Sequence, residues 1–271
     1  MSDHPIAARW QAVRAEQRAA LVPYLTAGYP TPALSLQALT LLEAAGADFV
    51  EVGVPFSDPL ADGPTIQRAT QAALEQGMNA ARVLEQVHQA ALGIPVVIMT
   101  YVNPVLAYGV ERFVTDARAA GAAGLLLTDV PAGADPQVER LVTAGSLALI
   151  RLIAPTTTPA RLAQTVAGAS GFVYLISRLG VTGTRDQVPA DLEAQVKRVR
   201  AVTSLPIAVG FGISNAAQAR AAARWADGVV VGSAVVEALG TGGLAAAERL
   251  LQDLAAAVRG ARGGRQGGGR G

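Results

Sequence analysis

Eight short apolar segments recur along the chain, and each is followed by a stretch with a helical pattern. The segments are rich in Val, Ile and Leu without polar alternation, which is typical of parallel strands buried on both faces. Eight such repeats in roughly 250 residues match the size of a (β/α)8 TIM barrel. A doubly wound sheet is the alternative, but it leaves two strands beyond its usual six. The predicted strands are Leu21–Thr26, Asp48–Val52, Ile94–Met99, Gly124–Leu127, Leu147–Ile153, Phe172–Ile176, Ile207–Val209 and Gly228–Val231. After the third of these strands we expect the helical pattern to resume only near Val110.

The predicted barrel is a single domain over residues 1–258, with an extra N-terminal helix over residues 3–18. Residues 259–271 contain only Gly and Arg apart from one Ala and one Gln, so they offer almost no apolar surface to bury. We expect this segment to be a disordered Gly/Arg tail. Its arginines could contact nucleic acid, but it has no aromatic side chain to stack on bases, and the net charge of the chain is +1. We therefore expect no nucleic-acid partner.

The sequence contains no cysteine, which excludes disulfides, thiolate nucleophiles and cysteine-based zinc sites. This composition fits a reducing compartment, and we expect a cytoplasmic protein. Prolines and glycines interrupt the two long stretches without Asp, Glu, Lys or Arg, 21–42 and 86–110, so we expect no membrane span. The N-terminal residues are polar and lack the apolar core of a signal peptide.

The stretch Glu51–Thr65, EVGVPFSDPLADGPT, carries the most unusual chemistry. It begins within the second predicted strand, where period-two alternation places Glu51 on the same face as Phe49 and Gly53, opposite three valines. If both faces are buried, Glu51 points into the interior, where an unpaired carboxylate costs several kcal/mol or has a raised pKa. A structural Glu that meets a neighbouring Arg is the alternative.

Asp62 lies in the same loop as Glu51, and the loop follows a strand, at the barrel face where active sites lie. Two carboxylates in one cleft allow one to act as an acid while the other stays ionised. Together with Asp58 and Asp129 they could in principle bind Mg²⁺, but nothing in their spacing requires it. We expect no metal.

Glycines follow the last two predicted strands, in Gly210-Phe211-Gly212 and Gly232-Ser233, and each group opens a helix. Backbone N–H groups at a helix N-terminus bind phosphate, and barrels commonly hold phosphate in these two loops. Gly183, in the polar loop after the sixth strand, could add one more N–H group. That loop, roughly residues 177–189, is long enough to act as a mobile lid.

The segment Glu51–Gln67, EVGVPFSDPLADGPTIQ, closely resembles the signature of the tryptophan synthase alpha subunit family. The segments VPYLTAGYP, TDVP, YLISRLGVTG and GFGIS also resemble this family, and the resemblance covers about residues 5–258. It implies a lyase that cleaves indole-3-glycerol phosphate into indole and glyceraldehyde 3-phosphate in tryptophan biosynthesis. It further implies an alpha2-beta2 heterotetramer in which only the tryptophan synthase beta subunit carries pyridoxal phosphate, so that this chain needs no cofactor.

The resemblance also implies residue roles. Glu51 corresponds to the glutamate that protonates the indole carbon bearing the glycerol chain and handles the hydroxyl proton, and Asp62 to the carboxylate that binds the indole N–H. The remaining implied residues bind the substrate (Tyr24, Thr26, Tyr101, Tyr174, Thr182, Phe211), bind its phosphate (Gly183, Gly212, Gly232, Ser233) or face the partner (Asp58, Pro59, Asn103).

Three other functions fit parts of this pattern. A different phosphosugar barrel would generally rely on a lysine, whereas the single lysine, Lys197, lies on a predicted helix. A non-catalytic activator of a beta subunit would not need both Glu51 and Asp62. A stand-alone lyase that releases indole remains open, and measuring indole production with and without a beta subunit separates it from the subunit function.

Overall fold

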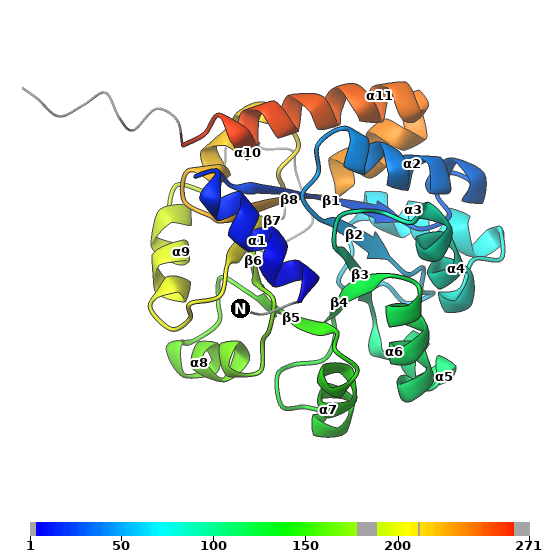
Figure 1. Cartoon of the computed structure of the whole chain (residues 1–271), viewed down its shortest axis with the longest axis horizontal. Coiled ribbons are helices and arrows are strands. Elements are labelled where there is room, and N and C mark those ends of the chain that lie inside the picture. Colours follow the sequence, from blue (N-terminus) through cyan, green and yellow to red (C-terminus); the bar gives the residue numbers. More distant parts are fainter. Residues whose placement is uncertain (1–3, 178–188, 211, 263–271) are drawn as a thin grey trace, which may run out of the picture.

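The computed structural model describes residues 4–177, 189–210 and 212–262. Eight parallel strands pair in chain order, and β8 closes on β1, so the predicted (β/α)8 barrel is confirmed (Figure 1). The strands are β1 (Ala20–Thr26), β2 (Val50–Gly53), β3 (Val96–Thr100), β4 (Ala122–Leu127), β5 (Ala148–Ile153), β6 (Val173–Ile176), β7 (Ile207–Gly210) and β8 (Gly228–Val231).

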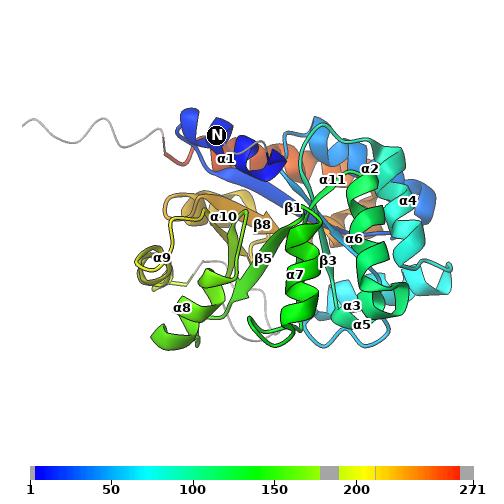
Figure 2. The ribbon, with the colours of Figure 1, turned by 60° about the horizontal axis from the view of Figure 1, so that its bottom comes forward.

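Helices surround the strands (Figure 2), and local capping sets where several of them begin. At five helices the side-chain oxygen of the N-cap residue accepts a backbone N–H group that has no partner within the helix. These N-caps are Thr31, Asn79, Asp135, Thr158 and Asn215. The helices are α1 (Pro5–Ala15), α2 (Pro32–Ala44), α3 (Pro64–Glu75), α4 (Ala80–Ala90), α5 (Val102–Tyr108), α6 (Val110–Ala119), α7 (Pro136–Ala144), α8 (Pro159–Ala167), α9 (Leu192–Arg200), α10 (Ala216–Ala223) and α11 (Ser233–Arg259).

Side chains alternate between two apolar layers along the strands. Val50 and Val52 belong to the layer between the strands and the helices, whereas Phe49 belongs to the cluster inside the barrel with Val97 and Ile150. The alternation predicted around Glu51 is therefore confirmed, and Glu51 lies on the inward side of β2.

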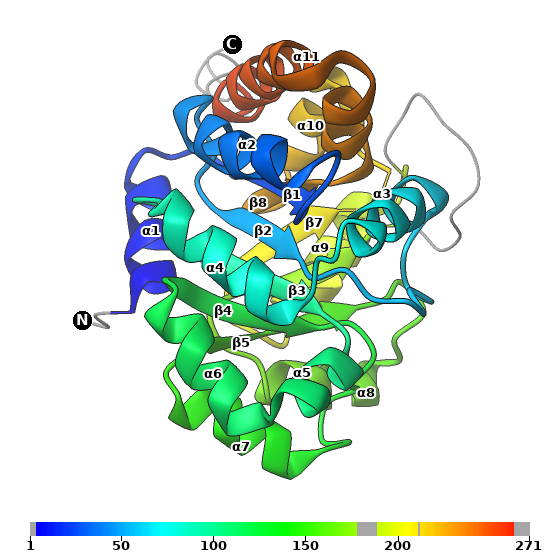
Figure 3. The same ribbon diagram turned by 90° about the vertical axis from the view of Figure 1, so that its right-hand side faces the viewer.

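Helix α1 covers the end of the barrel at which the strands begin (Figures 1 and 3). The Trp10 ring lies 4.7 Å from Phe49 and 5.7 Å from Phe172, measured between ring centroids. Ile6 and Val13, one turn to either side of Trp10, belong to the same interior cluster and are almost completely buried. Since apolar side chains fill this end, the opposite end, formed by the C-terminal ends of the strands, is left for chemistry.

A buried ion-pair network fastens α1 to the start of β2. The Asp48 carboxylate is completely buried and accepts two hydrogen bonds from Arg18, at 2.6 and 2.7 Å. It also accepts the Leu21 backbone N–H at 3.0 Å and pairs with Arg9 at 3.1 Å. Four donors compensate the cost of burying this charge, so removal of one partner would leave an uncompensated charge at the N-terminal end of the barrel.

Helix α5 differs from the sequence-based expectation, which placed no helix before Val110. Pro104 lies in its first turn, where a missing N–H breaks no intrahelical bond. The proline therefore does not prevent a helix here, and Asn103 lies on α5 rather than in an extended loop.

The start of the C-terminal tail also differs from the expectation. Helix α11 ends at Arg259, and the Arg262 guanidinium donates to the carbonyl oxygens of Ala223 at 3.2 Å and Ala226 at 2.6 Å. Residues 259–262 pack on the barrel because their arginines donate to backbone carbonyl groups, and the domain bounds 1–258 and 259–271 stay a prediction. Residues 263–271 lie outside the described part of the chain.

Candidate active site

Glu51 is a buried acid on the inner face of β2. Its neighbours in register are Tyr24 on β1 and Val97 on β3, and only 4% of its surface is exposed. Among the residues that the structure describes, none forms a hydrogen bond or an ion pair with its carboxyl. Burial, and secondly the negative charge of Asp62, raise the pKa of Glu51 to about 8. At neutral pH Glu51 is therefore a protonated acid.

Asp62 lies in the loop between β2 and α3 and is also buried. Burial raises its pKa to about 6, although the hydrogen bond that the Tyr101 hydroxyl donates to Asp62 Oδ2 at 3.1 Å acts in the opposite direction. Asp62 is thus mainly ionised at neutral pH, while Glu51 is mainly protonated. Two neighbouring carboxyl groups whose pKa values are separated in this way can act as an acid and as a stabiliser of positive charge.

Two buried tyrosines pack beside these carboxyl groups, Tyr24 on β1 and Tyr174 on β6. Burial is the main reason why the pKa of each phenol lies well above its ordinary value; next comes the charge of Asp62 for Tyr24 and of Glu51 for Tyr174. Both phenols are therefore neutral hydrogen-bond donors. The Tyr24 hydroxyl lies 3.1 Å from Thr26 Oγ1.

Two glycines make room for these phenols. A Cβ atom on Gly53 would collide with the Tyr24 hydroxyl, and one on Gly210 would collide with the Tyr174 hydroxyl. Sequence reasoning assigned Gly210 to a phosphate loop and gave Gly53 no role. The two glycines are explained by the close approach of inward tyrosines at neighbouring strand ends.

The ends of β7 and β8 supply the glycine turns expected to bind phosphate. Gly232 precedes Ser233, the first residue of α11, and no side chain in the described part of the chain caps that helix. Its first backbone N–H groups can therefore bind an anion. Gly212 has a φ of 81°, a conformation that favours glycine. Thr182, Gly183 and Phe211 lie outside the described residues.

The residues expected to face a partner lie on the surface at the same end of the barrel. Asp58 and Asn103 are exposed and Pro59 is half-buried. Two apolar side chains accompany them that sequence reasoning did not single out, Leu60 at 94% exposure and Leu106 at 50%. Leu60 could have been recognised from the sequence, because residues of turns are usually polar and a leucine in the loop between β2 and α3 is therefore unusual.

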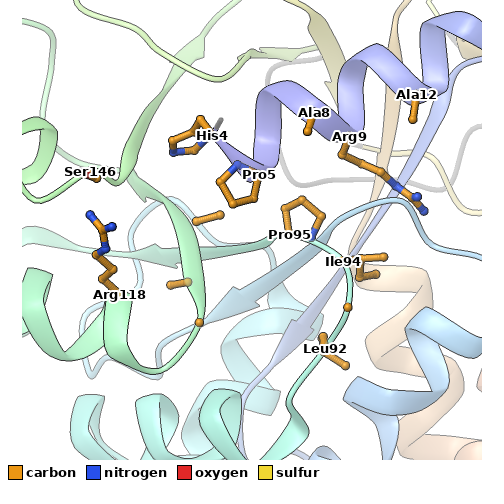
Figure 4. Close-up of a pocket in the computed structure, with 14 residues that line it drawn as sticks. His4, Pro5, Ala8, Arg9, Ala12, Leu92, Ile94, Pro95, Arg118 and Ser146 are labelled. Atoms are coloured by element: carbon orange, nitrogen blue, oxygen red, sulfur yellow. The ribbon is translucent and has the colours of Figure 1, made fainter. Parts of the chain in front are cut away.

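A groove of about 820 Å³ opens at the other end of the barrel, between α1 and the turns before β3 and β4 (Figure 4). Its lining includes His4, Arg9, Arg118 and Ser146 but none of the predicted site residues. In the part of the chain that the structure describes, no group of three or more acidic or histidine side chains could hold a metal ion. Within the same residues, no helix is both long and apolar enough to cross a membrane.

A closed (β/α)8 barrel with a protonated and an ionised carboxyl group at the C-terminal ends of its strands defines an acid–base enzyme. The family model described as tryptophan synthase alpha chain matches residues 10–262, and the chain belongs to this family.

Relatives and solved structures agree with this assignment. The tryptophan synthase alpha chain of Mycobacterium avium (strain 104) is 47% identical over 251 residues, which cover 92% of this chain and 93% of the relative. That of Picosynechococcus sp. is 42% identical over 261 residues, or 93% and 98% of the two chains. A solved structure of Mycobacterium tuberculosis tryptophan synthase is similar with a TM-score of 0.89 at 44% identity, covering 95% of this chain and 99% of that chain.

Proposed function

We propose that this chain is the alpha-subunit lyase of tryptophan biosynthesis, which cleaves indole-3-glycerol phosphate into indole and glyceraldehyde 3-phosphate. Family membership supports the reaction. The observation that carries the mechanism is the pair of buried carboxyl groups, Glu51 protonated and Asp62 ionised at neutral pH. A retro-aldol cleavage needs a proton donor at the ring carbon and an anion beside the ring nitrogen, and this pair supplies both.

In the first step, Glu51 gives its proton to the indole carbon that bears the glycerol chain. Positive charge develops on the ring nitrogen, and the Asp62 carboxylate stabilises it by accepting the N–H hydrogen bond. In the second step, the adjacent side-chain hydroxyl gives its proton to the now ionised Glu51. The carbon–carbon bond then breaks, its electron pair returns to the ring, and the hydroxyl carbon becomes the aldehyde. Glu51 ends the cycle protonated, as it began.

The substrate phosphate binds at the glycine turns after β7 and β8, where Gly212, Gly232 and Ser233 offer backbone N–H groups. Gly183 completes this set in our proposal, and Phe211 is proposed to bind the indole part of the substrate. The indole and glycerol parts then lie among the side chains at the mouth of the barrel: Tyr24, Thr26, Tyr101, Tyr174 and, from the loop after β6, Thr182.

The beta subunit is the partner, and we infer that it docks on the surface that carries Asp58, Pro59 and Asn103. The exposed leucines beside these residues support this surface, because the buried core of a protein interface is more apolar than the rest of the protein surface. We further infer an alpha2-beta2 assembly in the cytoplasm, with pyridoxal phosphate bound only by the beta subunit.

The test is release of indole from indole-3-glycerol phosphate by the purified full chain, alone and with a beta subunit. Glu51→Gln keeps the size of the side chain but removes its proton, and it should lower the rate by at least roughly 10²–10⁴-fold. Glu85→Gln on the exposed face of α4 is the matched control and should keep the wild-type rate. A Glu51→Gln variant that cleaves substrate at the wild-type rate would refute the proposed mechanism. Absence of indole release by the wild type under both conditions would refute the reaction itself.

A further inference from the structure

The Tyr101 side chain connects three parts of the C-terminal mouth. Tyr101 follows β3 directly and occupies the N-cap position of α5. Its hydroxyl accepts the Ala61 backbone N–H at 2.9 Å and donates to Asp62 Oδ2 at 3.1 Å. Its ring packs on Phe56, with centroids 5.2 Å apart. One phenol therefore contacts both the beginning and the end of the loop between β2 and α3.

We propose that Tyr101 is a positioning residue for the lyase reaction, which holds the Asp62 carboxylate in place beside the substrate ring by fastening its loop to the junction of β3 and α5. This role extends the proposed function, on which it rests, because it assigns to the Tyr101 hydroxyl an action through Asp62, in addition to the place of the Tyr101 side chain beside the substrate.

The loop has few other connections to the barrel. Two of its backbone hydrogen bonds are internal, from Leu60 N–H to the Asp58 carbonyl at 2.9 Å and from Asp62 N–H to the Pro59 carbonyl at 3.0 Å, and the Ser57 hydroxyl donates to the Asp58 carboxylate at 2.9 Å. Gln67 on α3 donates to the Asp62 carbonyl at 2.9 Å and so holds the backbone, not the carboxylate. Among the described residues, only Tyr101 forms a hydrogen bond with the Asp62 side chain.

Tyr101 is itself firmly held, as a positioning residue must be. It is 5% exposed, and its carbonyl accepts the Thr100 hydroxyl at 3.2 Å. The next residue, Val102, donates its backbone N–H to Asp129 Oδ1 at 2.9 Å, which anchors the start of α5. Because ring and backbone are both fixed, the hydroxyl can impose one orientation on Asp62.

The same hydrogen bond affects the charge of Asp62. The ionisable groups that interact with Asp62 are Glu51 on β2, Tyr24 on β1 and Tyr101. Burial and the Asp62 charge raise the pKa of the Tyr101 phenol, so it keeps its proton and remains a donor. That donated bond lowers the pKa of Asp62 against the effect of burial. Removal of the hydroxyl should therefore raise the pKa of Asp62 above about 6.

The experiment compares the wild type with Tyr101→Phe, which keeps the ring on Phe56 and removes only the hydroxyl. We expect kcat for indole release to fall roughly 10- to 100-fold, which corresponds to one hydrogen bond to a charged group, while KM changes little. The acid limb of the pH profile should move to higher pH, because Asp62 then ionises later. Tyr108→Phe is the matched control: it removes a hydroxyl that donates to the Asp116 carboxylate at 2.7 Å, also from α5, and should leave the profile unchanged.

A double-mutant cycle with Asp62→Asn separates positioning from direct contact. If Tyr101 acts through Asp62, the double variant should be no slower than Asp62→Asn alone. Losses that multiply would overturn the proposal, as would a Tyr101→Phe enzyme with the wild-type kcat and acid limb.

A readout that does not need catalysis covers the remaining cases. Carbon-13 NMR of labelled aspartate, with Asp62→Asn to assign the signal, gives the pKa of Asp62 in each folded variant. An unchanged pKa in Tyr101→Phe refutes the inference even if the wild type releases no indole. A raised pKa without indole release refutes the proposed reaction but supports the link between Tyr101 and Asp62.

Discussion

Replacing Glu51 by Gln should make the folded protein more stable at neutral pH, although it removes the acid that we assign to catalysis. Glu51 is buried on β2 next to Asp62, where the neutral form is strongly favoured. In the unfolded chain the same side chain is free to ionise. Glutamine has nearly the same shape and is neutral in both states, so this substitution isolates the cost of the ionisable group.

The structure gives the size and the pH range of this effect. The pKa of Glu51 rises from 4.5 to about 8 on folding. Because folding raises this pKa, the contribution of Glu51 to the stability of the folded state is fully present below pH 4.5 and is lost as the pH rises through 8. At pH 7, which is about 2.5 units above the pKa of 4.5 in the unfolded chain, ionisation of Glu51 stabilises the unfolded state. At 1.36 kcal/mol per unit this lowers the free energy of unfolding by about 3 kcal/mol. At pH 5 the same calculation gives less than about 1 kcal/mol.

Urea denaturation at pH 5 and pH 7 measures this difference. Glu51→Gln should exceed the wild type in free energy of unfolding by about 3 kcal/mol at pH 7 and should nearly equal it at pH 5. Glu85→Gln on the exposed face of α4 should stay within about 0.5 kcal/mol of the wild type at both pH values. If Glu51→Gln raised the free energy of unfolding by the same amount at both pH values, the stabilisation would not come from ionisation, and the reasoning would be refuted.

The other predictions concern activity, the core and the partner. The pH profile of kcat/KM for indole release should be bell-shaped, rising as Asp62 ionises near pH 6 and falling as Glu51 loses its proton near pH 8; a flat profile from pH 5 to 9 would contradict the roles assigned to them. Asp48→Ala should lower the free energy of unfolding by about 3–5 kcal/mol in urea titration, because it leaves the buried Arg18 guanidinium with only the exposed Glu16 as a carboxylate partner, and a negligible loss would contradict the proposed network. Gly53→Ala should cost roughly 1–3 kcal/mol of stability, because its Cβ collides with a buried phenol; thermal unfolding tests this, and an unchanged Tm would show that the phenol moves freely. Leu60→Asp should weaken beta-subunit binding roughly tenfold or more in calorimetry without altering the fold, and undiminished affinity would place the interface elsewhere.

The sequence predicted the barrel well because each strand is a continuous apolar segment that ends at a turn. Period-two alternation predicted that Glu51 lies on the strand face opposite Val50 and Val52, and the two apolar layers of the structure identify that face as the inward one. Helix α5 was missed because the Asn103-Pro104 pair suggests a turn, whereas a proline in the first turn is compatible with a helix.

Contacts between distant residues could not be predicted in the same way. The hydrogen bond from Tyr101 to Asp62 joins residues 39 positions apart, and only the arrangement of β2 and β3 brings them together. Asp48 was expected to begin a strand, but its role as acceptor for Arg18 depends on how the segment between α1 and β1 lies beside the start of β2. Periodicity indicates which way a side chain points, not which side chain it meets there.

The fluorescence of the Trp10 indole reports on closure of the β-barrel. The Trp10 ring packs at the N-terminal end of the barrel against Phe49, Phe172 and the backbone at Gly228. These three residues come from the first, the third and the last quarter of the polypeptide. During synthesis this packing site is incomplete until nearly the whole chain has been made, so until then the indole lies in a different environment. In a variant with Trp225→Phe, the fluorescence of Trp10 should therefore record one of the latest events in folding.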